Sequence, residues 1–224
     1  MFLNIQNLKK AYEEEVIFDG FNMSLYEHEI TCVLGPSGVG KSTLFNMIAN
    51  IETYDSGTIE GLAHKRIAYV FQEDRLLEWK NVYDNIAFVI AEEKNIRMRV
   101  EEAIRSVKLT GYENYYPKEL SGGMRQRVSL ARAFVYKPDL MLMDEPFKGL
   151  DIALKEGIID DFEAHWEKNK YCVIMSTHDI EEAIRLAQRI IVLGKKPVVA
   201  MADIDAKEMD KGHLRRQIKK HLEE

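Results

Sequence analysis

The 224-residue sequence contains only two cysteines, Cys32 and Cys172, each within an apolar run that is typical of a buried strand. Two isolated thiols do not make the disulfide framework of a small secreted domain, and their spacing is not that of a metal site. We therefore interpret both as small core residues. A reducing cytoplasm is the simplest compartment for such a chain.

The sequence also lacks a long apolar run and an excess of positive charge. No segment approaches the roughly 20 apolar residues that cross a bilayer, and Met1–Tyr12 shows no secretory signal pattern. The net charge of −6 argues against nucleic acid as the main partner. We expect no nucleic-acid binding, and we expect any membrane role to come through a partner protein.

The length of 224 residues suits one large α/β domain. Polar and apolar residues alternate over Met1–Ile30, which predicts antiparallel strands. Helical spacing predicts helices over Val82–Ala91 and around Val100–Val107. A last apolar strand is predicted at Arg189–Gly194. The basic amphipathic segment Met209–Leu222 either docks onto its own domain or touches anionic lipid.

The stretch Val33–Thr43 reads V-L-G-P-S-G-V-G-K-S-T and lies between an apolar strand, Glu29–Leu34, and a helical run, Leu44–Ala49. Its three glycines let backbone N–H groups converge at the start of a helix, which favours phosphate oxygens. Lys41 adds a charge for the β- and γ-phosphates, and Ser42 can ligate Mg²⁺. A glycine-rich turn without a ligand would need neither side chain, so this segment predicts a phosphate-binding loop.

Two further apolar strands end in polar residues. The run L-M-L-M-D-E ends in Asp144 and Glu145, and Tyr171–Thr177 leads to His178. Carboxyl ends of parallel strands form the ligand side of an α/β sheet. We predict that Asp144 holds Mg²⁺ and that Glu145 deprotonates a water, with His178 contacting the γ-phosphate. The alternatives are solvated loop acids and a structural histidine.

The segment Leu120–Arg127, L-S-G-G-M-R-Q-R, is a second candidate anion site, because paired glycines precede the helical run Met124–Phe134. A simple helix cap would explain Ser121 and one glycine only. Three other features stay open. Tyr12 either stacks on a base or is an ordinary strand residue, and Gln72 either reaches a metal or caps its strand. The cluster Leu76, Leu77 and Trp79 is either core or a lining for a partner.

The phosphate loop, Gln72, the L-S-G-G segment, the D-E-P-F strand end and His178 occur in the order of the ATP-binding cassette family. The chain closely resembles the nucleotide-binding subunit of a bacterial ABC transporter over about residues 3–194. The implied fold is a P-loop NTPase with a RecA-like α/β core (about 1–72 and 137–205) and an N-terminal antiparallel β subdomain. It also has an inserted helical subdomain (about 73–136) and a C-terminal helix (about 209–224), within one domain over 1–224.

The resemblance also implies roles for individual residues. Tyr12 resembles the aromatic that stacks on adenine, and the Walker A loop comprises Gly35, Pro36, Ser37, Gly38, Val39, Gly40, Lys41, Ser42 and Thr43. Gln72 resembles the Q-loop glutamine, which implies that it ligates the metal and takes part in catalysis. Asp144 resembles the aspartate that binds magnesium, Glu145 resembles the catalytic base, and His178 resembles the switch histidine. The family's signature motif corresponds to Ser121, Gly122, Gly123 and Met124. Asp151 corresponds to the last residue of the D-loop.

The same resemblance implies a head-to-tail homodimer. One ATP needs only one of the two anion sites on each side, so Ser121 and Gly123 of one subunit cap the γ-phosphate held by Lys41 of the other. Opening and closing then drive a partner permease at the cytoplasmic face of the membrane, with an extracytoplasmic solute-binding protein. Leu76, Leu77 and Trp79 are the predicted permease contact.

The segment V-F-Q-E-D-R-L-L-E-W is similar to importers of the nitrate, sulfonate and taurine group, although these usually have proline where this chain has Glu78, and its segment 57–66 is short. The sequence thus predicts a Mg²⁺-dependent ATPase that powers uptake of a small solute. The alternatives are an ABC exporter ATPase, a non-transport ABC ATPase, and a P-loop kinase, which would leave L-S-G-G without a role.

Overall fold

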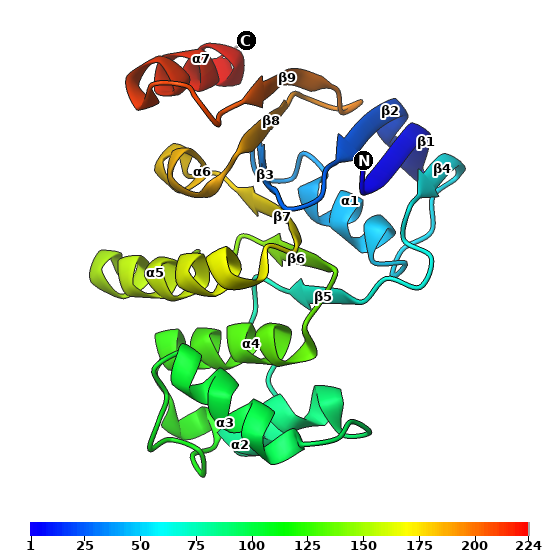
Figure 1. Cartoon of the computed structure of the whole chain (residues 1–224). Coiled ribbons are helices and arrows are strands. Elements are labelled where there is room, and N and C mark those ends of the chain that lie inside the picture. Colours follow the sequence, from blue (N-terminus) through cyan, green and yellow to red (C-terminus); the bar gives the residue numbers. More distant parts are fainter. Residues whose placement is uncertain (224) are drawn as a thin grey trace.

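The chain is built around one six-stranded sheet (Figure 1). A computed structural model describes residues 1–223. The strands, in spatial order, are β5 (Ile67–Val70), β6 (Leu140–Asp144), β7 (Cys172–Thr177), β3 (Ile30–Leu34), β8 (Arg189–Leu193) and β9 (Ala200–Asp205). The first five run parallel, and β9 pairs antiparallel with β8. The predicted α/β class is confirmed.

The central strands are buried on both faces. Along β6, Leu140 and Leu142 pack into one hydrophobic core while Met141 and Met143 pack into the other. Alternate side chains of a strand point to opposite faces, so a continuous apolar run needs a cover on each side. The sheet is therefore the middle layer of three, and the carboxyl ends of its parallel strands form one edge.

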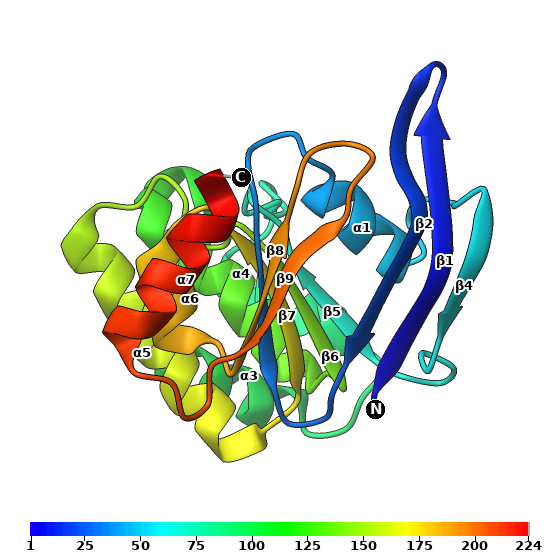
Figure 2. The same cartoon turned by 90° about the horizontal axis from the view of Figure 1, so that it is seen from above.

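One face of this sheet is covered by α1 (Lys41–Ile48) and by a small antiparallel sheet (Figure 2). That sheet has the order β2-β1-β4 and consists of β1 (Leu3–Tyr12), β2 (Glu15–Leu25) and β4 (Ser56–Glu60). The alternation within Met1–Ile30 correctly predicts β1 and β2. Their apolar side chains share a core with α1, which fixes the helix against the sheet.

Helices cover the other face (Figure 2). They are α2 (Val82–Ala87), the 3₁₀ turn η1 (Phe88–Ile90), α3 (Ile96–Ser106), the 3₁₀ turn η2 (Pro117–Glu119), α4 (Gly122–Tyr136), α5 (Ile152–Asn169) and α6 (Ile180–Leu186). The segment from α2 to α4 connects β5 to β6. Val100, Ala103 and Ile104 are buried, which confirms the apolar face predicted for α3. As a result, α1 and α4 lie on opposite faces of the sheet.

The C-terminal part holds one strand that the sequence pattern does not predict. The antiparallel edge strand β9 leads into α7 (Lys211–Glu223). Leu214 and Ile218 of α7 are 2% and 0% exposed and join the main core, while Arg215 pairs with Glu181 of α6. The apolar stripe of this helix thus docks onto its own domain. Within residues 1–223, no helix combines the length and the apolar character needed to span a bilayer.

Both cysteines are buried strand residues, as predicted. Cys32 on β3 is 0% exposed and Cys172 on β7 is 2% exposed. Burial raises the pKa of the Cys32 thiol, and burial together with Glu29 and Glu27 raises the pKa of Cys172 to about 12. Because the thiolate is the reactive form, neither side chain is a nucleophile at neutral pH.

A half-buried histidine links α4 and α5. The ring of His165 stacks on Phe134, with centroids 3.8 Å apart and planes 7° apart. Burial, with a smaller effect of Lys168, lowers the pKa of His165 from 6.5 to about 4. Between these two values the unfolded chain binds a proton that the folded chain does not, so the free energy of unfolding decreases as pH falls through this window.

We expect a fall from about pH 7.5 to about pH 5.5 to remove about 1 kcal/mol of stability through His165 alone. Urea unfolding of the wild type and of His165→Phe at both pH values measures this, and the variant should lose that part of the pH dependence. The control is His64→Asn, since His64 is exposed. An unchanged pH dependence in His165→Phe would contradict the assignment.

Candidate functional site

The predicted phosphate loop connects β3 to the N-terminus of α1, at the carboxyl edge of the sheet. Gly38 and Gly40 have φ angles of 76° and 125°, which L side chains rarely adopt. A Cβ atom at Gly40 would lie 2.8 Å from Cγ2 of Ile17. Glycine is therefore required at position 40 by both the backbone and the neighbouring strand β2, and the loop can curl at the start of the helix.

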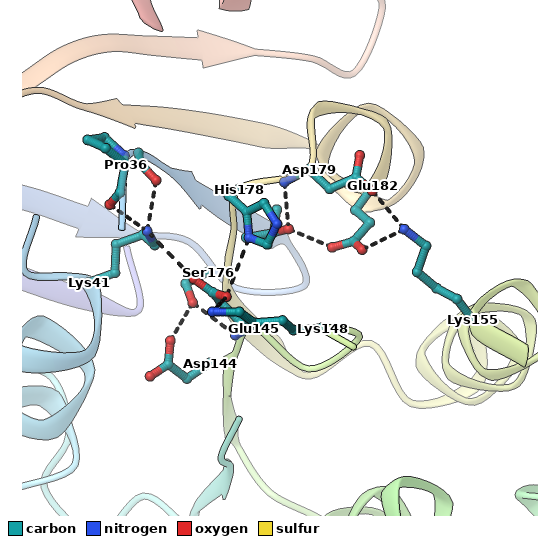
Figure 3. A network of polar contacts seen from close by, with 12 residues as sticks. Pro36, Lys41, Asp144, Glu145, Lys148, Lys155, Ser176, His178, Asp179 and Glu182 are labelled. Atoms are coloured by element: carbon teal, nitrogen blue, oxygen red, sulfur yellow. Dashed lines mark hydrogen bonds and ion pairs between the residues drawn. The ribbon is translucent and has the colours of Figure 1, made fainter. Parts of the chain in front are cut away.

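Lys41, the first residue of α1, is 5% exposed. Its Nζ donates to the carbonyl oxygens of Gly35 at 2.8 Å and Pro36 at 3.0 Å (Figure 3). Burial lowers the pKa of the Lys41 ammonium, and the carboxylates of Glu145 and Asp144 oppose this effect. The loop therefore holds a poorly solvated positive charge, which a phosphate group would stabilise.

The ends of β6 and β7 bring two acids next to a serine. Asp144 lies opposite Ser176 in the strand register, and the Ser176 hydroxyl donates to Oδ1 of Asp144 at 2.5 Å. The next residue, Glu145, has φ 44°. This left-handed conformation costs a non-glycine residue about 1–2 kcal/mol. It is held by the Glu145 N–H, which donates to the backbone oxygen of Ser176 at 3.1 Å and to its Oγ at 3.0 Å.

The Glu145 carboxylate lies close to two lysines and a histidine. Its Oε1 lies 3.9 Å from Nζ of Lys41, and its Oε2 lies 2.6 Å from Nζ of Lys148 and 3.4 Å from Nδ1 of His178. Burial raises the pKa of Glu145, but Lys148, Lys41 and His178 together outweigh this and hold it below the ordinary value. The carboxylate is therefore ionised at neutral pH, as a proton acceptor must be.

The loop that carries His178 is fixed by hydrogen bonds on its far side. The Thr177 hydroxyl donates to Glu182 at 2.6 Å and accepts from the N–H of Asp179 at 3.0 Å. Lys155 of α5 pairs with both Asp179 and Glu182 (Figure 3). Asp179 caps α6, and the Thr177 hydroxyl, not the Glu182 carboxylate, accepts from the N–H of Asp179.

The L-S-G-G segment forms the start of α4. Ser121 is the N-cap and accepts from the N–H of Met124 at 3.3 Å. Gly122 and Gly123 lie in the first turn, and a Cβ at Gly123 would come within 2.0 Å of the Leu154 side chain of α5. Because α4 and α1 pack on opposite faces of the sheet, this helix end and the phosphate loop are two separate candidate anion sites of the chain.

Residues 18–148 match the family model described as ABC transporter. This match covers more than half of the chain. The chain belongs to the ABC transporter family. The matched region includes the phosphate loop, the L-S-G-G segment and both acids at the end of β6, whereas His178 lies beyond it.

Several relatives within the ABC transporter family carry the same name. The aliphatic sulfonates import ATP-binding protein SsuB of Bacillus cereus is 36% identical over 208 residues, 88% of this chain and 83% of the relative. The protein of that name from Bacillus licheniformis is 38% identical over 84% of this chain and 76% of its own length. The aliphatic sulfonates import ATP-binding protein SsuB 2 of Pseudomonas syringae pv. tomato is 37% identical over 87% of this chain and 83% of its own length.

Solved structures of ABC proteins share the fold. The ATP-binding cassette MJ0796, described as a dimer in a post-hydrolysis state bound to ADP and Pi, superposes with a TM-score of 0.80 at 27% identity. The match covers 92% of this chain and all of that one. CbiO1 from Clostridium perfringens, described as part of the ABC transporter complex cbiONQ, superposes with a TM-score of 0.83 at 26% identity. That match covers 99% of this chain and 96% of CbiO1. The predicted P-loop NTPase fold is confirmed.

Other predicted residues of this ABC chain lie outside the cluster of Figure 3. Tyr12 ends β1 and is 41% exposed, with the Lys10 ammonium 4.6 Å from its ring centroid. Gln72 follows β5 and is exposed. Asp151 accepts from the N–H of Leu154 and caps α5. The structure leaves Tyr12 and Gln72 accessible and gives Asp151 a helix-capping position.

The predicted permease-contact residues differ in exposure. Trp79 is 75% exposed, whereas Leu76 is 8% exposed and belongs to the main core. Leu77 is half-buried, and its N–H donates to the side chain of Asn85. The inclusion of Leu76 needs correction, because its side chain packs into the core and offers almost no surface to a partner.

The donor set near Lys41 suits magnesium. In the part of the chain that the structure describes, the one hydrogen bond to the Asp144 carboxylate comes from Ser176, at Oδ1, and Ser42 is exposed. Both are hard oxygen donors, which Mg²⁺ prefers together with phosphate oxygens. Among residues 1–223 no three His, Cys, Asp or Glu side chains gather as a metal cluster. The residues present therefore fit an ion that shares its coordination with a nucleotide.

Three residues of the site are absent from the sequence-based predictions: Lys148, Ser176 and Thr177. Lys148 follows Glu145 by three residues and pairs with it. Ser176 and Thr177 are hydroxyl residues at the end of an otherwise apolar strand, both fully or almost fully buried. The sequence signal for Ser176 and Thr177 is a pair of hydroxyl residues at the end of an apolar strand, directly before His178.

Proposed function

We propose that this protein is the ATP-hydrolysing subunit of an importer for a small solute. The observation that carries the ATPase is the meeting of Lys41, Asp144, Glu145 and His178 at one edge of the sheet. The names of the relatives favour import over export. They also favour a solute of the sulfonate group, which agrees with the predicted similarity to nitrate, sulfonate and taurine importers.

ATP binding in this proposal begins at the phosphate loop. The N–H groups of the loop and the start of α1 receive the phosphates, and the Lys41 ammonium exchanges its carbonyl contacts for the β- and γ-phosphates. Tyr12, exposed at the end of β1, stacks on the adenine ring. Ser42 and Asp144 hold Mg²⁺, with Gln72 as a further ligand. The ion, when bound, neutralises phosphate charge and orients the terminal phosphate.

Hydrolysis then depends on Glu145 and His178. The ionised Glu145 carboxylate accepts a proton from the attacking water. Because Lys41 and Lys148 lie beside this carboxylate, they stabilise its charge before the reaction. His178, 3.4 Å from Oε2 of Glu145, is placed to donate to the γ-phosphate. When the γ-phosphate leaves after hydrolysis, His178 loses this hydrogen-bond acceptor.

The two anion-binding elements explain why the protein dimerises. The start of α4 lies on the other face of the sheet from α1, so Ser121 caps the nucleotide of a partner copy and not its own. Gly122, Gly123 and Met124 approach the same phosphate from the partner's side. The dimeric state of the cassette MJ0796 supports such a pairing, with Asp151 at the interface.

We further propose that residues 73–136 act as a helical subdomain that transmits this closure to a permease. The remainder of 1–224, with its C-terminal helix docked, then acts as the core. The subunit works at the cytoplasmic face of the membrane, and an extracytoplasmic binding protein supplies the solute. Trp79, exposed between β5 and α2, is the proposed anchor for the permease.

Affinity purification of the tagged subunit from gently solubilised native membranes tests the proposed function. Mass spectrometry should identify a permease and a solute-binding protein in the purified complex. A soluble partner without any membrane protein would refute the importer and leave the ATPase. ATP hydrolysis by the purified subunit without an acceptor substrate separates it from a P-loop kinase.

Replacing Trp79 with alanine should weaken the permease contact without affecting the fold. Aromatic anchors at interface centres cost about 2 kcal/mol or more when truncated, so we expect at least about a tenfold loss of permease in the same purification. The control is Tyr54→Ala, since Tyr54 is an exposed aromatic residue outside 73–136. Normal recovery of the permease with Trp79→Ala, at equal expression, would show that the contact lies elsewhere.

A further inference from the structure

The Ser176 hydroxyl lies between the two acids of the site and contacts both residues. It is 0% exposed. Its Oγ is 2.5 Å from Oδ1 of Asp144 and 3.0 Å from the backbone nitrogen of Glu145 (Figure 3). No role for this serine follows from the motifs of the phosphate loop, the signature or the strand end.

The directions of these two hydrogen bonds are fixed by chemistry. An ionised carboxylate only accepts and a backbone N–H only donates. The hydroxyl hydrogen of Ser176 is therefore committed to Asp144, and an oxygen lone pair receives the N–H of Glu145. A bond from a hydroxyl to a carboxylate is charge-assisted and short. The serine thus acts as a bridge that one side chain supplies to two adjacent residues.

The bridge has a different consequence for each acid. At Asp144 it occupies Oδ1 and orients the carboxylate, so that Oδ2 is the oxygen left for a metal ion. At Glu145 it helps to hold the left-handed backbone, φ 44°, from which the carboxylate reaches Lys41 and His178. Without the hydroxyl, the Asp144 carboxylate loses this restraint, and the N–H of Glu145 keeps only its contact with the backbone oxygen of Ser176.

We propose that Ser176 is a positioning residue that orients Asp144 toward the magnesium of a bound nucleotide and fixes the backbone of Glu145. This inference rests on the proposed ATPase. Removal of a residue that orients a metal ligand typically costs 10–100-fold in metal affinity or activity. Within residues 1–223 the Ser176 hydroxyl bonds only to Asp144 and Glu145 and to no residue of the Walker A loop, Gly35–Thr43. Metal-free nucleotide binding should therefore not depend on this hydroxyl.

The test measures the affinity of a fluorescent ATP analogue with Mg²⁺ and with EDTA, for wild type and Ser176→Ala. In EDTA we expect the two proteins to bind the analogue with equal affinity, within about twofold. Adding Mg²⁺ should increase the affinity of the variant by a factor at least about 10-fold smaller than the factor for the wild type. Hydrolysis at saturating nucleotide should fall about 10–100-fold, mainly in kcat. The matched control is Ser129→Ala, since Ser129 is a buried serine of α4 outside this bridge.

The outcomes are distinct. An undiminished gain with Mg²⁺ in Ser176→Ala overturns the proposal for Ser176 and leaves the ATPase standing. An equal loss of affinity in EDTA and in Mg²⁺, together with a lower urea midpoint, overturns it in favour of a purely structural serine. A wild type that neither binds nor hydrolyses ATP overturns the proposed function and this inference with it.

Discussion

Glu145→Gln is expected to reduce ATP hydrolysis by about 10²–10⁴-fold, the usual contribution of a general base. Glutamine has nearly the same shape but cannot accept the proton of the attacking water. The effect on binding should be opposite in sign. The carboxylate lies 3.9 Å from the Lys41 ammonium and 2.6 Å from that of Lys148, and its neutralisation leaves the site more positive. ATP should therefore bind at least as tightly as to the wild type.

Phosphate release and binding of a fluorescent ATP analogue, measured on the same preparations, test both parts. The ATP-bound variant should also accumulate as a dimer in size-exclusion chromatography, because hydrolysis no longer removes the γ-phosphate. The exposed Glu92 provides a control, Glu92→Gln. Full turnover in Glu145→Gln would remove the general base, and loss of ATP binding would assign Glu145 a structural role instead.

Lys41→Met should weaken ATP binding, in contrast to Glu145→Gln. The methionine retains most of the side-chain volume but removes the charge, so we expect ATP affinity to fall on the order of 10–100-fold, the usual worth of hydrogen bonds to a charged group. Stability should not fall with it. Lys41 is 5% exposed and burial lowers the pKa of its ammonium, so the folded protein loses an unfavourably solvated charge.

Nucleotide titration and urea unfolding of Lys41→Met measure these two effects separately. Lys118→Met, on an exposed side chain, controls for the loss of a lysine as such. Wild-type affinity in Lys41→Met would exclude this lysine as a phosphate ligand. A large fall in the urea midpoint would mean that its contacts with Gly35 and Pro36 stabilise the loop, and that the binding data report misfolding.

The ends of the buried strands could be predicted from sequence because continuous apolar runs such as L-M-L-M mark strands of a parallel sheet. Polar residues after such runs meet at one edge whatever the strand order. The order itself, in which β7 separates β6 from β3, is not encoded in any local pattern. For that reason Asp144 and His178 were predicted, whereas the bond between Ser176 and Asp144 was not.

Two other features depended on tertiary context. The strand β9 alternates weakly and pairs only at the edge of the sheet, so its sequence carries little of the apolar signal that marks β3 or β7. Leu76 and Trp79 are both large apolar residues in one loop, and only the packing of the main core buries the first and leaves the second exposed. Sequence alone could not separate them.

The burial of Cys32 and Cys172 has a practical consequence. With both native thiols sealed inside β3 and β7, the wild-type chain already serves as an unreactive background for maleimide labelling. A single Trp79→Cys substitution would then introduce one accessible sulfhydryl, to which a photo-crosslinker could be attached without removing any native residue of the core. The neighbour captured there would identify, at the level of a single residue, the surface that this loop contacts in the proposed complex with a permease.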